Sequence, residues 1–327
     1  MFILALLLAA AVPAAVPAQS PHRKAPFLQE PASRTISVLG IQLHYLDWGG
    51  SGEALVLVPG GCETGYVFGD IAPALTDRFR VLSLTQRGCG SSGRPTDGYD
   101  LDTQLREMAG FLDALSIKAA TFAGHSSGGG KITRLARLYP SRVSRLVYFD
   151  TVYSFIAPGI EEKMGAAIIK QIGGSPEESF EMFAKYNQVW ELGAWSSWMD
   201  RNLHETMAVD GTGKLKSVSA PAWFSAFRAD MEAGRYFETR ITHRALMFFA
   251  IDLGQRRLRM LGEETRAELR PLAEDTDRRR RFQIEEFRRN GSHIRIVEMT
   301  GAAHYCFVQK PAAIIREMRD FLGVATQ

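Results

Sequence analysis

The chain has 327 residues, of which 46% are hydrophobic and 23% are charged. This is ordinary globular composition, and the length allows a large core or a core with an insertion. The net charge is only +3, from 39 basic and 36 acidic side chains, so we expect no nucleic-acid partner. The arginine run 278–281, followed by Glu285 and Glu286, indicates a solvated helix face rather than a binding patch.

The first 18 residues are apolar and end in Val16-Pro17-Ala18, which fits a signal-peptidase site. The apolar run 2–12 is shorter than the roughly 20 residues that span a bilayer. No Lys or Arg precedes it, so a misassigned start or a retained membrane anchor stays open. We expect a signal peptide over 1–18, a mature tail over 19–34, export to the periplasm or medium, and no stable membrane insertion after processing.

The chain has three cysteines: Cys62, Cys89 and Cys306. This number is small for an exported protein, so the fold does not depend on a disulfide framework. One disulfide with a free thiol is compatible with the sequence, and the pair stays open. No two cysteines stand at metal-ligand spacing near a histidine cluster, and we predict neither a metal nor a cofactor.

Short β-rich runs alternate with helical patterns over residues 35–150. Two runs flank Gly40 and predict a hairpin, and the apolar run 54–58 is typical of a buried strand. Further strands are predicted at 79–84, 119–123, 145–149, 245–250 and 294–298, and helices at 101–115, 128–139 and 311–322. Such alternation predicts a mainly parallel sheet with helices on both faces.

Residues 152–240 have almost no β-rich run but contain many aromatic residues. Glycine and proline breaks divide this segment into several predicted helices. We therefore predict one sheet domain, formed by residues 35–151 and 241–327, with a helical lid over 152–240.

The segment Gly124-His125-Ser126-Ser127-Gly128 places a serine between an apolar strand end and a predicted helix. A serine on such a turn needs small neighbours, because the backbone bends sharply there. The turn exposes the serine oxygen and directs the positive end of the helix dipole at it. The pattern favours Ser126 as a nucleophile over a serine that only caps a glycine-rich helix.

Four motifs in chain order resemble those of the α/β-hydrolase fold superfamily, in its lidded serine hydrolase and esterase branch. Residues 59–62 stand at the family's oxyanion loop, 86–92 at its Arg-Gly-x-Gly-x-Ser loop, 124–128 at its nucleophile elbow and 301–304 at its histidine loop. The resemblance covers residues 35–322. It implies a mostly parallel eight-stranded sheet flanked by helices, with an inserted helical lid and the chain order Ser, acid, His.

The resemblance implies that His304 is the base that activates Ser126. The acid that orients this histidine usually follows the seventh strand of the fold, and Asp252 stands just beyond the run 245–250. Asp150, at the end of the sixth strand, is the alternative, because some relatives place the acid there. We expect Asp252 to be the acid, although its run is shorter than the usual Gly-x-x-Asp pattern.

The oxyanion of an acyl-transfer reaction needs backbone N–H donors. We expect these donors at Gly61 and at Ser127, the residue after the nucleophile. Gly61 has no side chain, so a substrate can approach its loop closely. Pro59 replaces the family's usual histidine, which removes a polar group that braces the loop, and Cys62 is expected to line the acyl pocket.

The aromatic residues of the insertion have two interpretations. Most of them supply the core of a small helical domain, but a lid must also present apolar surface over the serine. The candidates for this second role are Trp190, Trp195, Trp198, Trp223 and Phe227. We therefore expect a small-molecule substrate, a small to medium apolar or aromatic carboxylic ester cleaved through an acyl-enzyme.

Other functions stay open as alternatives. The same catalytic residues act on an amide, a lactone or a carbon–carbon bond in relatives of the family. Epoxide hydrolases and haloalkane dehalogenases need a carboxylate where this chain has Ser126, which disfavours them. A non-catalytic ligand-binding protein is a further hypothesis, disfavoured because a serine, a histidine and a suitably placed aspartate all remain.

Overall fold

The computed structural model describes residues 29–151 and 159–323. The predicted signal peptide, 1–18, lies outside the described residues. So do the first part of the predicted tail, 19–28, and the start of the predicted lid, 152–158.

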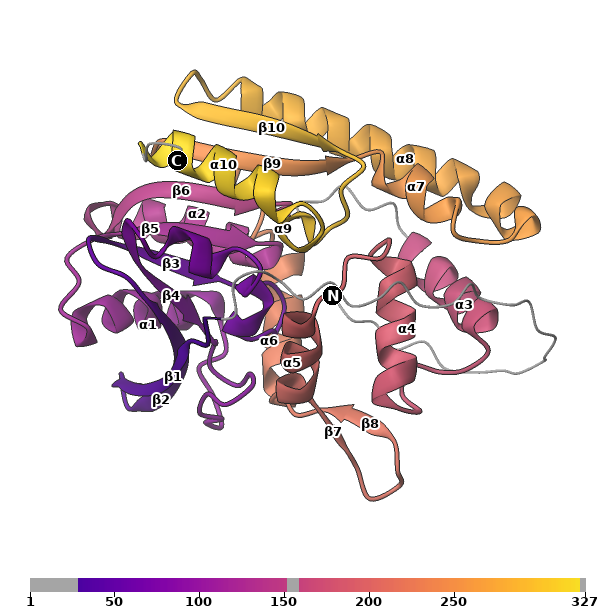
Figure 1. Cartoon of the computed structure of the whole chain (residues 1–327), viewed down its shortest axis with the longest axis horizontal. Helices are drawn as coiled ribbons and strands as arrows, with labels where there is room; N and C mark the ends of the chain where they lie inside the picture. Colours follow the sequence, from indigo (N-terminus) through magenta and orange to yellow (C-terminus); the bar gives the residue numbers. More distant parts are fainter. Residues whose placement is uncertain (1–28, 152–158, 324–327) are drawn as a thin grey trace.

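A sheet of eight strands forms the centre of the molecule (Figure 1). The strands are β1 (Ala32–Val38), β2 (Ile41–Gly49), β3 (Glu53–Val58), β4 (Phe79–Leu84), β5 (Ala120–His125), β6 (Val143–Phe149), β9 (Ala245–Ile251) and β10 (Ile294–Thr300). Their order is β1-β2-β4-β3-β5-β6-β9-β10. β2 pairs antiparallel with β1 and β4, and the other neighbours pair parallel. The predicted mostly parallel eight-stranded sheet is confirmed.

Successive residues of a strand point to opposite faces of the sheet. Both faces of this sheet are apolar, and helices cover both of them. In β3, Val56 and Val58 belong to one hydrophobic core and Leu55 and Leu57 to the other. The first core is covered by α1 (Leu101–Ala114), α2 (Ser127–Leu138) and the end of α8 (Glu263–Arg288), and the second by α9 (Cys306–Gln309), α10 (Pro311–Leu322) and the short helices η1 (Gly65–Phe68) and η2 (Ala72–Leu75). Two further short helices, η3 (Pro140–Arg142) and α7 (Leu253–Leu258), lie in connections.

Between β6 and β9 the described chain forms four helices and a small hairpin. They are α3 (Ile160–Ile172), α4 (Phe180–Trp190), α5 (Ser197–Thr206), the hairpin strands β7 (Met207–Val209) and β8 (Leu215–Ser217), and α6 (Pro221–Glu232). In Figure 1 this segment lies on the side toward which the arrow of β9 points. The hairpin differs from the expected all-helical insertion. Its turn is closed by Asp210, whose side chain accepts the N–H groups of Thr212 and Lys214, as aspartate commonly does in turns.

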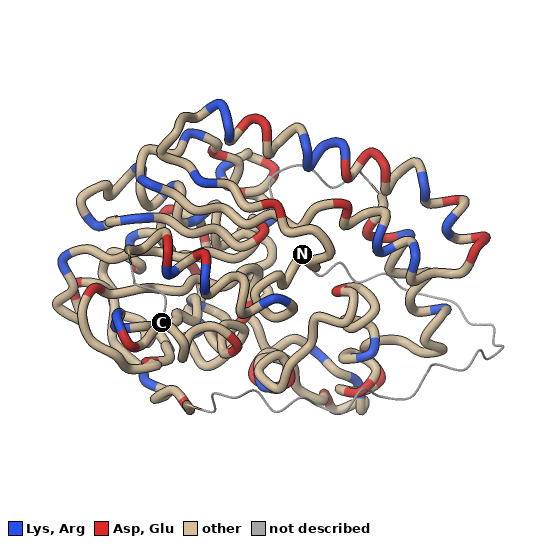
Figure 2. Tube along the Cα trace, turned by 45° about the horizontal axis from the view of Figure 1, so that its top comes forward, with Lys and Arg blue, Asp and Glu red and all other residues tan. Residues whose placement is uncertain are grey.

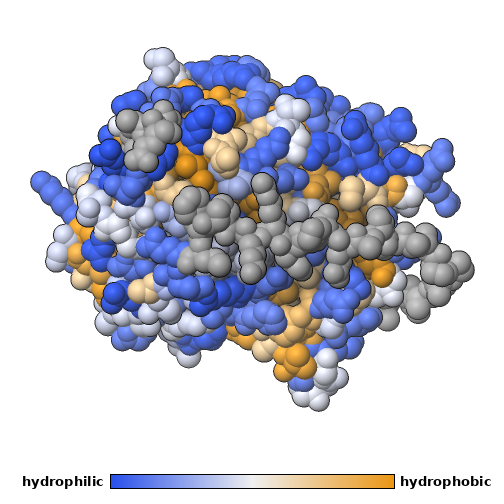
Figure 3. Space-filling view, in the orientation of Figure 1, coloured by the Kyte–Doolittle hydropathy of each residue, from blue (hydrophilic) through white to orange (hydrophobic). Residues whose placement is uncertain are grey.

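The surface carries mixed charge. Basic and acidic residues alternate along α8 (Figure 2), and the face seen in Figure 3 is mostly hydrophilic. On α8 the side chains of Arg278, Arg279 and Arg281 are exposed and pair with aspartates, so the prediction of a solvated run holds for these three. None of the described helices has the length and apolar character that a bilayer-spanning segment requires.

Candidate active site

Ser126 stands at the junction of β5 and α2, with a φ of 52° and a ψ of −124°. Residues other than glycine rarely adopt this backbone conformation. The turn is possible only with small neighbours: a Cβ atom at Gly124 would lie 2.6 Å from the backbone of Gly128. A Cβ atom at Gly128 would lie 2.4 Å from the carbonyl oxygen of Val58. The sharp turn therefore requires glycine on both sides of the serine, as the sequence predicts.

His304 lies in the loop between β10 and α9, and its Nδ1 is 2.7 Å from Oδ2 of Asp150. Asp150 directly follows β6 and is fully buried. Its other oxygen, Oδ1, accepts the backbone N–H of Ala250 at 2.8 Å. The His304 ring packs on the ring of His125, with centroids 4.5 Å apart, and His125 immediately precedes Ser126. The structure thus brings the turn of the serine, the histidine and Asp150 together.

The expectation that Asp252 orients His304 is wrong. The side chain of Asp252 is 42% exposed and pairs with Arg281 instead. The strand order gives the reason: β6 lies directly beside β5, which leads to Ser126, whereas β9 lies one strand farther away. An aspartate at the end of β6 is therefore nearer to the elbow, and the alternative acid, Asp150, takes the position beside His304.

The side chain of Arg280 reaches from α8 into this site, contrary to the prediction of a solvated run. It is 1% exposed, and its Nη1 donates to Oδ1 of Asp150 and to the carbonyl oxygen of Ala250. Burial alone would raise the pKa of Asp150, but the charge of Arg280 and the hydrogen bond from His304 hold that pKa well below its ordinary range. Asp150 is therefore ionised, as a group that orients an imidazole must be.

Burial and the neighbouring His125 lower the pKa of His304 well below its ordinary value, although Asp150 opposes this shift. His304 is therefore neutral at pH 7. Because Asp150 accepts a hydrogen bond at Nδ1, the ring's Nε2 is left as the proton acceptor. In the described structure no hydrogen bond joins this ring to Ser126; such bonds are often long before a substrate binds.

The rings of His125 and Tyr305 pack against His304, and the carboxylate of Glu63 contacts both of these residues. The ring of Tyr305 packs on that of His125 with centroids 4.6 Å apart. Its hydroxyl donates to Oε1 of Glu63, and Oε2 of Glu63 lies 3.6 Å from Nδ1 of His125. The rings of His304, His125 and Tyr305 thus form one cluster. Asp150 contacts this cluster at His304, and Glu63 contacts it at Tyr305 and His125.

The loop after β3 brings Gly61, one of the two expected oxyanion donors, beside Ser127, which is the other. The N–H of Gly61 donates to Oγ of Ser127 at 2.9 Å. The carbonyl oxygen of Gly60 accepts the N–H of Glu63 at 3.2 Å. A trans peptide points its N–H away from its carbonyl, so this bond turns the Gly61 N–H toward the elbow. Ser127 begins α2, and the first N–H of a helix has no partner within that helix.

A disulfide joins Cys62 to Cys89, which is the pair that the sequence left open. It ties the loop of Gly61 to the loop that follows β4. Cys62 is therefore a buried half of a disulfide, and its expected place in an acyl pocket stays a prediction. Cys306 is a free, buried cysteine.

The aromatic side chains of the insertion belong mainly to hydrophobic cores. Trp198 packs against Trp48 with ring centroids 5.2 Å apart, and Trp223 stacks on Phe227 at 5.0 Å. All four are buried. The other two candidates, Trp190 and Trp195, are partly buried and contact Tyr186 and Asp200. The interpretation as core residues therefore fits Trp198, Trp223 and Phe227, and the expected role over the serine is not what their packing shows.

Two further polar residues lie close to the loop of Gly61 and are absent from the predicted site: Gln86 and Lys131. Both are buried. Lys131 stands on the buried side of α2, three residues after Gly128 and four before Leu135, so helical periodicity is a signal that could have found it. Within residues 29–151 and 159–323, no three His, Cys, Asp or Glu side chains are grouped so that they could hold a metal ion.

Known proteins share this architecture. Residues 53–195 match the family described as alpha/beta hydrolase fold. The crystal structure of E-2-(acetamidomethylene)succinate hydrolase aligns with a TM-score of 0.64 and 20% sequence identity, over 90% of this chain and 100% of that one. The chain therefore has the α/β-hydrolase fold.

Curated relatives of this chain match it over part of their own length. Bifunctional epoxide hydrolase 2 of Mus musculus is 30% identical over 182 residues, which are 53% of this chain and 31% of that protein. N-formylmaleamate deformylase of Pseudomonas putida is 36% identical over 121 residues, 36% of this chain and 45% of that protein. The matched segments thus span less than half of either relative.

Proposed function

We propose that this α/β-hydrolase is a serine hydrolase that cleaves a small to medium apolar or aromatic carboxylic ester through an acyl-enzyme. Ser126 is the nucleophile, His304 the base and Asp150 the acid. The observation that carries the proposal is the 2.7 Å contact between His304 Nδ1 and Asp150 Oδ2, next to a strained serine turn. A neutral, oriented imidazole beside such a turn is the arrangement that activates a serine hydroxyl.

The proposed reaction has two halves. Ser126 Oγ attacks the ester carbonyl carbon while its proton moves to Nε2 of His304, and Asp150 stabilises the imidazolium. The N–H groups of Gly61 and Ser127 donate to the new oxyanion, and for the Gly61 N–H this bond replaces the one to the Ser127 hydroxyl. The C–O bond to the alcohol then breaks and His304 returns the proton to the alcohol. Water, deprotonated by the same imidazole, attacks the acyl-enzyme and releases the acid and free Ser126.

The identity of the nucleophile separates ester cleavage from the activity in the name of the epoxide hydrolase relatives. Attack of a serine oxygen on an epoxide would leave an ether on Ser126, which water does not readily cleave. A carboxylate nucleophile would leave an ester, which water can cleave. A serine at this position therefore favours an acyl substrate.

Amide cleavage is the second candidate. It is favoured by the printed names of two similar proteins, N-formylmaleamate deformylase and E-2-(acetamidomethylene)succinate hydrolase. The first name describes removal of an N-formyl group, and the second names a substrate that contains an amide. Cleavage of an acyl–nitrogen bond needs the same nucleophile, base and oxyanion donors. A substrate panel of esters, anilides, lactones and diketones, with acyl chains of increasing length, separates the bond types.

A fluorophosphonate probe and p-nitrophenyl butyrate test the proposal. We expect the probe to label Ser126 covalently and Ser126→Ala to abolish both labelling and turnover. Ser91→Ala is the matched control, because Ser91 is exposed and its hydroxyl contacts Glu205. Turnover that persists in Ser126→Ala would refute the nucleophile. Tight ligand binding with neither labelling nor turnover would favour a non-catalytic protein instead.

We also propose that the protein is exported. The apolar segment 1–18 and the disulfide between Cys62 and Cys89 support this, because disulfides persist mainly in oxidising compartments. Fractionation of cells that express the full chain is the test. Recovery of the protein only from the cytoplasm, with its first 18 residues attached, would refute the proposal.

A further inference from the structure

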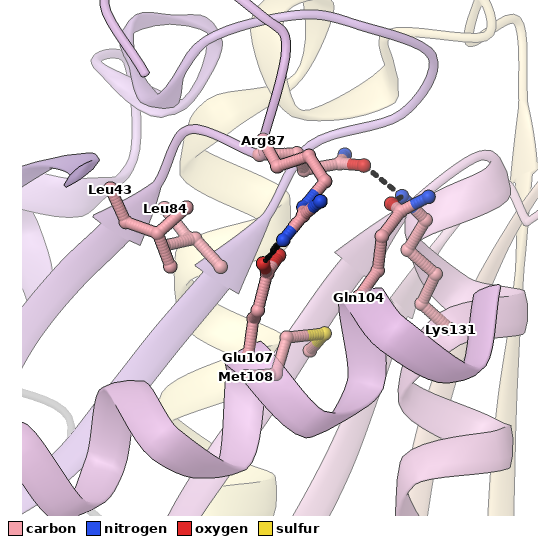
Figure 4. Close-up of a pocket in the computed structure, with 8 residues that line it drawn as sticks. Leu43, Leu84, Arg87, Gln104, Glu107, Met108 and Lys131 are labelled. Carbon is pink, nitrogen blue, oxygen red and sulfur yellow. Dashed lines mark hydrogen bonds and ion pairs between the residues drawn. The ribbon is translucent and has the colours of Figure 1, made fainter. Parts of the chain in front are cut away.

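A buried polar chain connects the helix after the nucleophile to the loop of Gly61. Figure 4 shows the end of this chain at which Lys131 lies beside Gln104. The polar chain starts at Lys131 on α2, which is fully buried. The Lys131 Nζ donates to Oε1 of Gln86 and to Oε1 of Gln104, the latter at 2.5 Å. The Gln86 Nε2 donates to the carbonyl oxygens of Pro59 at 2.9 Å and of Gly61 at 3.4 Å. Two side chains thus span the distance from the helix to the oxyanion loop.

Lys131 determines which way the Gln86 amide faces. A glutamine amide has an acceptor at one end and two donors at the other, and the two ends are nearly equal in size. Burial lowers the pKa of Lys131 to about 7, although the charges of Glu107 and Asp230 oppose this shift. In its ammonium form the side chain can only donate. The Oε1 of Gln86 therefore faces Lys131, and its Nε2 faces the loop, where two carbonyl oxygens accept.

Gly61 itself adds little to the rigidity of this loop, although the disulfide of Cys62 anchors its far end. Gly61 has a φ of +49°, and no atom lies within 4 Å of the position of a Cβ there, so packing does not fix it. Glycine also has more backbone freedom to lose than any other residue. Gln86 holds the carbonyl groups on either side of Gly60, while the N–H of Glu63 holds the Gly60 carbonyl itself. Together these bonds keep the Gly61 N–H directed at the elbow.

The lysine is itself held in place by rigid surroundings. It stands four residues after Ser127 on the same helix, about one turn away. Its ammonium lies 5.7 Å from the centre of the Trp223 ring, within the range of a cation–π contact. The helix that supplies the Ser127 N–H therefore also supplies the group that orients the other donor through Gln86.

We infer that Lys131, acting through Gln86, is a positioning residue that holds the Gly61 N–H where the oxyanion forms. This inference rests on the proposed serine hydrolase function and adds to it how the oxyanion loop is braced. The family's usual histidine would brace the loop at position 59, where this chain has Pro59. Gln86 braces the loop there instead, by donating to the carbonyl oxygen of Pro59.

Steady-state kinetics on p-nitrophenyl butyrate test the inference with Gln86→Met, Lys131→Met and the double variant. Methionine approximates the length of both side chains but donates no hydrogen bond. Each single variant should lower kcat about 10- to 100-fold and change KM by less than about threefold. This decrease in kcat does not exceed the decrease that follows removal of a whole oxyanion donor. The double variant should lose no more than Gln86→Met, because both changes break one chain of contacts.

The affinity for a transition-state analogue distinguishes a displaced oxyanion donor from a general loss of stability. A trifluoromethyl ketone forms an oxyanion adduct on a nucleophilic serine, so its affinity should fall by the same factor as kcat. Gln104→Met is the matched control: Gln104 is the other acceptor of Lys131, but its Nε2 donates to Tyr99 at 2.6 Å rather than to the loop. We expect its kcat to stay within about threefold of wild type.

If Gln86→Met does not fold, Gln86→Glu replaces it, because a carboxylate still accepts from Lys131 but cannot donate to the loop. Wild-type kcat in either Gln86 variant would overturn the inference and leave the proposed nucleophile intact. An equal loss in Gln104→Met would also overturn it. A wild-type protein that neither reacts with the fluorophosphonate nor turns over any acyl substrate would refute the proposed function, and the inference with it.

Discussion

Replacing Asp150 with asparagine keeps the shape of the side chain but removes the charge that orients His304. In a serine protease triad the equivalent change lowers kcat about 10⁴-fold, or about 5.4 kcal/mol of transition-state stabilisation. In this chain both oxygens of Asp150 accept hydrogen bonds, one from His304 at 2.7 Å and one from the N–H of Ala250 at 2.8 Å. An amide can satisfy only one of these donors with its oxygen, so we expect a loss of that order.

The same substitution also affects stability, because it leaves Arg280 buried without the charge of Asp150. The two side chains are 2% and 0% exposed, and breaking a buried ion pair typically costs about 3–5 kcal/mol. The double variant Asp150→Asn/Arg280→Met removes both charges. It should regain most of the lost free energy of unfolding but none of the activity, which separates the catalytic effect from the structural one.

Asp252→Asn is the matched control, since it makes the same change at the other candidate acid. Its ion pair with Arg281 is exposed, and such pairs contribute about 0–1 kcal/mol. The assay combines kcat and KM on p-nitrophenyl butyrate, thermal unfolding, and a count of active sites with a fluorophosphonate. A large loss of kcat in Asp252→Asn together with a near wild-type kcat in Asp150→Asn would refute the assignment.

Three further predictions concern pH, the disulfide and the elbow. Because burial and a neighbouring histidine depress the pKa of His304, the acidic limb of kcat/KM should lie below pH 6.5, and a limb above that value would contradict the shift. Below pH 6.5 the His304 side chain is protonated in the unfolded chain but still neutral in the folded protein. The free energy of unfolding should therefore fall as the pH drops below 6.5, and equilibrium unfolding in urea across that range measures it. Cys62 and Cys89 close a loop with a sequence separation of 27, which limits the entropy of the unfolded chain. Replacing both by serine should lower the free energy of unfolding in urea by about 3.5 kcal/mol. A decrease of less than about 1 kcal/mol would contradict this entropic origin of the stabilisation. Gly60→Ala would place a Cβ atom 2.6 Å from the Cβ of Ser126, so it should lower kcat more than about tenfold. Gly211→Ala is the control: its Cβ meets no atom within 4 Å, and kcat should not change in this way.

The sheet could be predicted because its signals are local. Each strand is an apolar run bounded by glycine, proline or charge, as at 54–58 before Pro59, and each intervening helix has apolar residues at helical spacing. The hairpin of β7 and β8 was missed because its strands have three residues each, too few to show an alternating pattern. Its turn residues, Asp210 and Gly213, were the only signal.

The parts of the site that adjacent residues create could also be predicted. The elbow depends on Gly124 and Gly128 beside Ser126, and the loop of Gly61 follows one strand directly. The partners that come from elsewhere in the chain could not. Asp150 and His304 are 154 residues apart, and the order of the strands makes Asp150, the alternative candidate, nearer than the expected Asp252.

One pattern in the sequence would nevertheless have favoured Asp150. The buried positions of α8 include Ala273, Asp277, Arg280, Ile284 and Phe287, spaced three or four residues apart, so Arg280 falls on the inward face of the helix. A buried guanidinium needs a buried counter-charge. An aspartate at the inner end of a central strand provides one, whereas the partner of an exposed arginine can itself remain exposed. The helical spacing within the arginine run therefore predicts both a buried arginine and the ionised acid that lies beside His304.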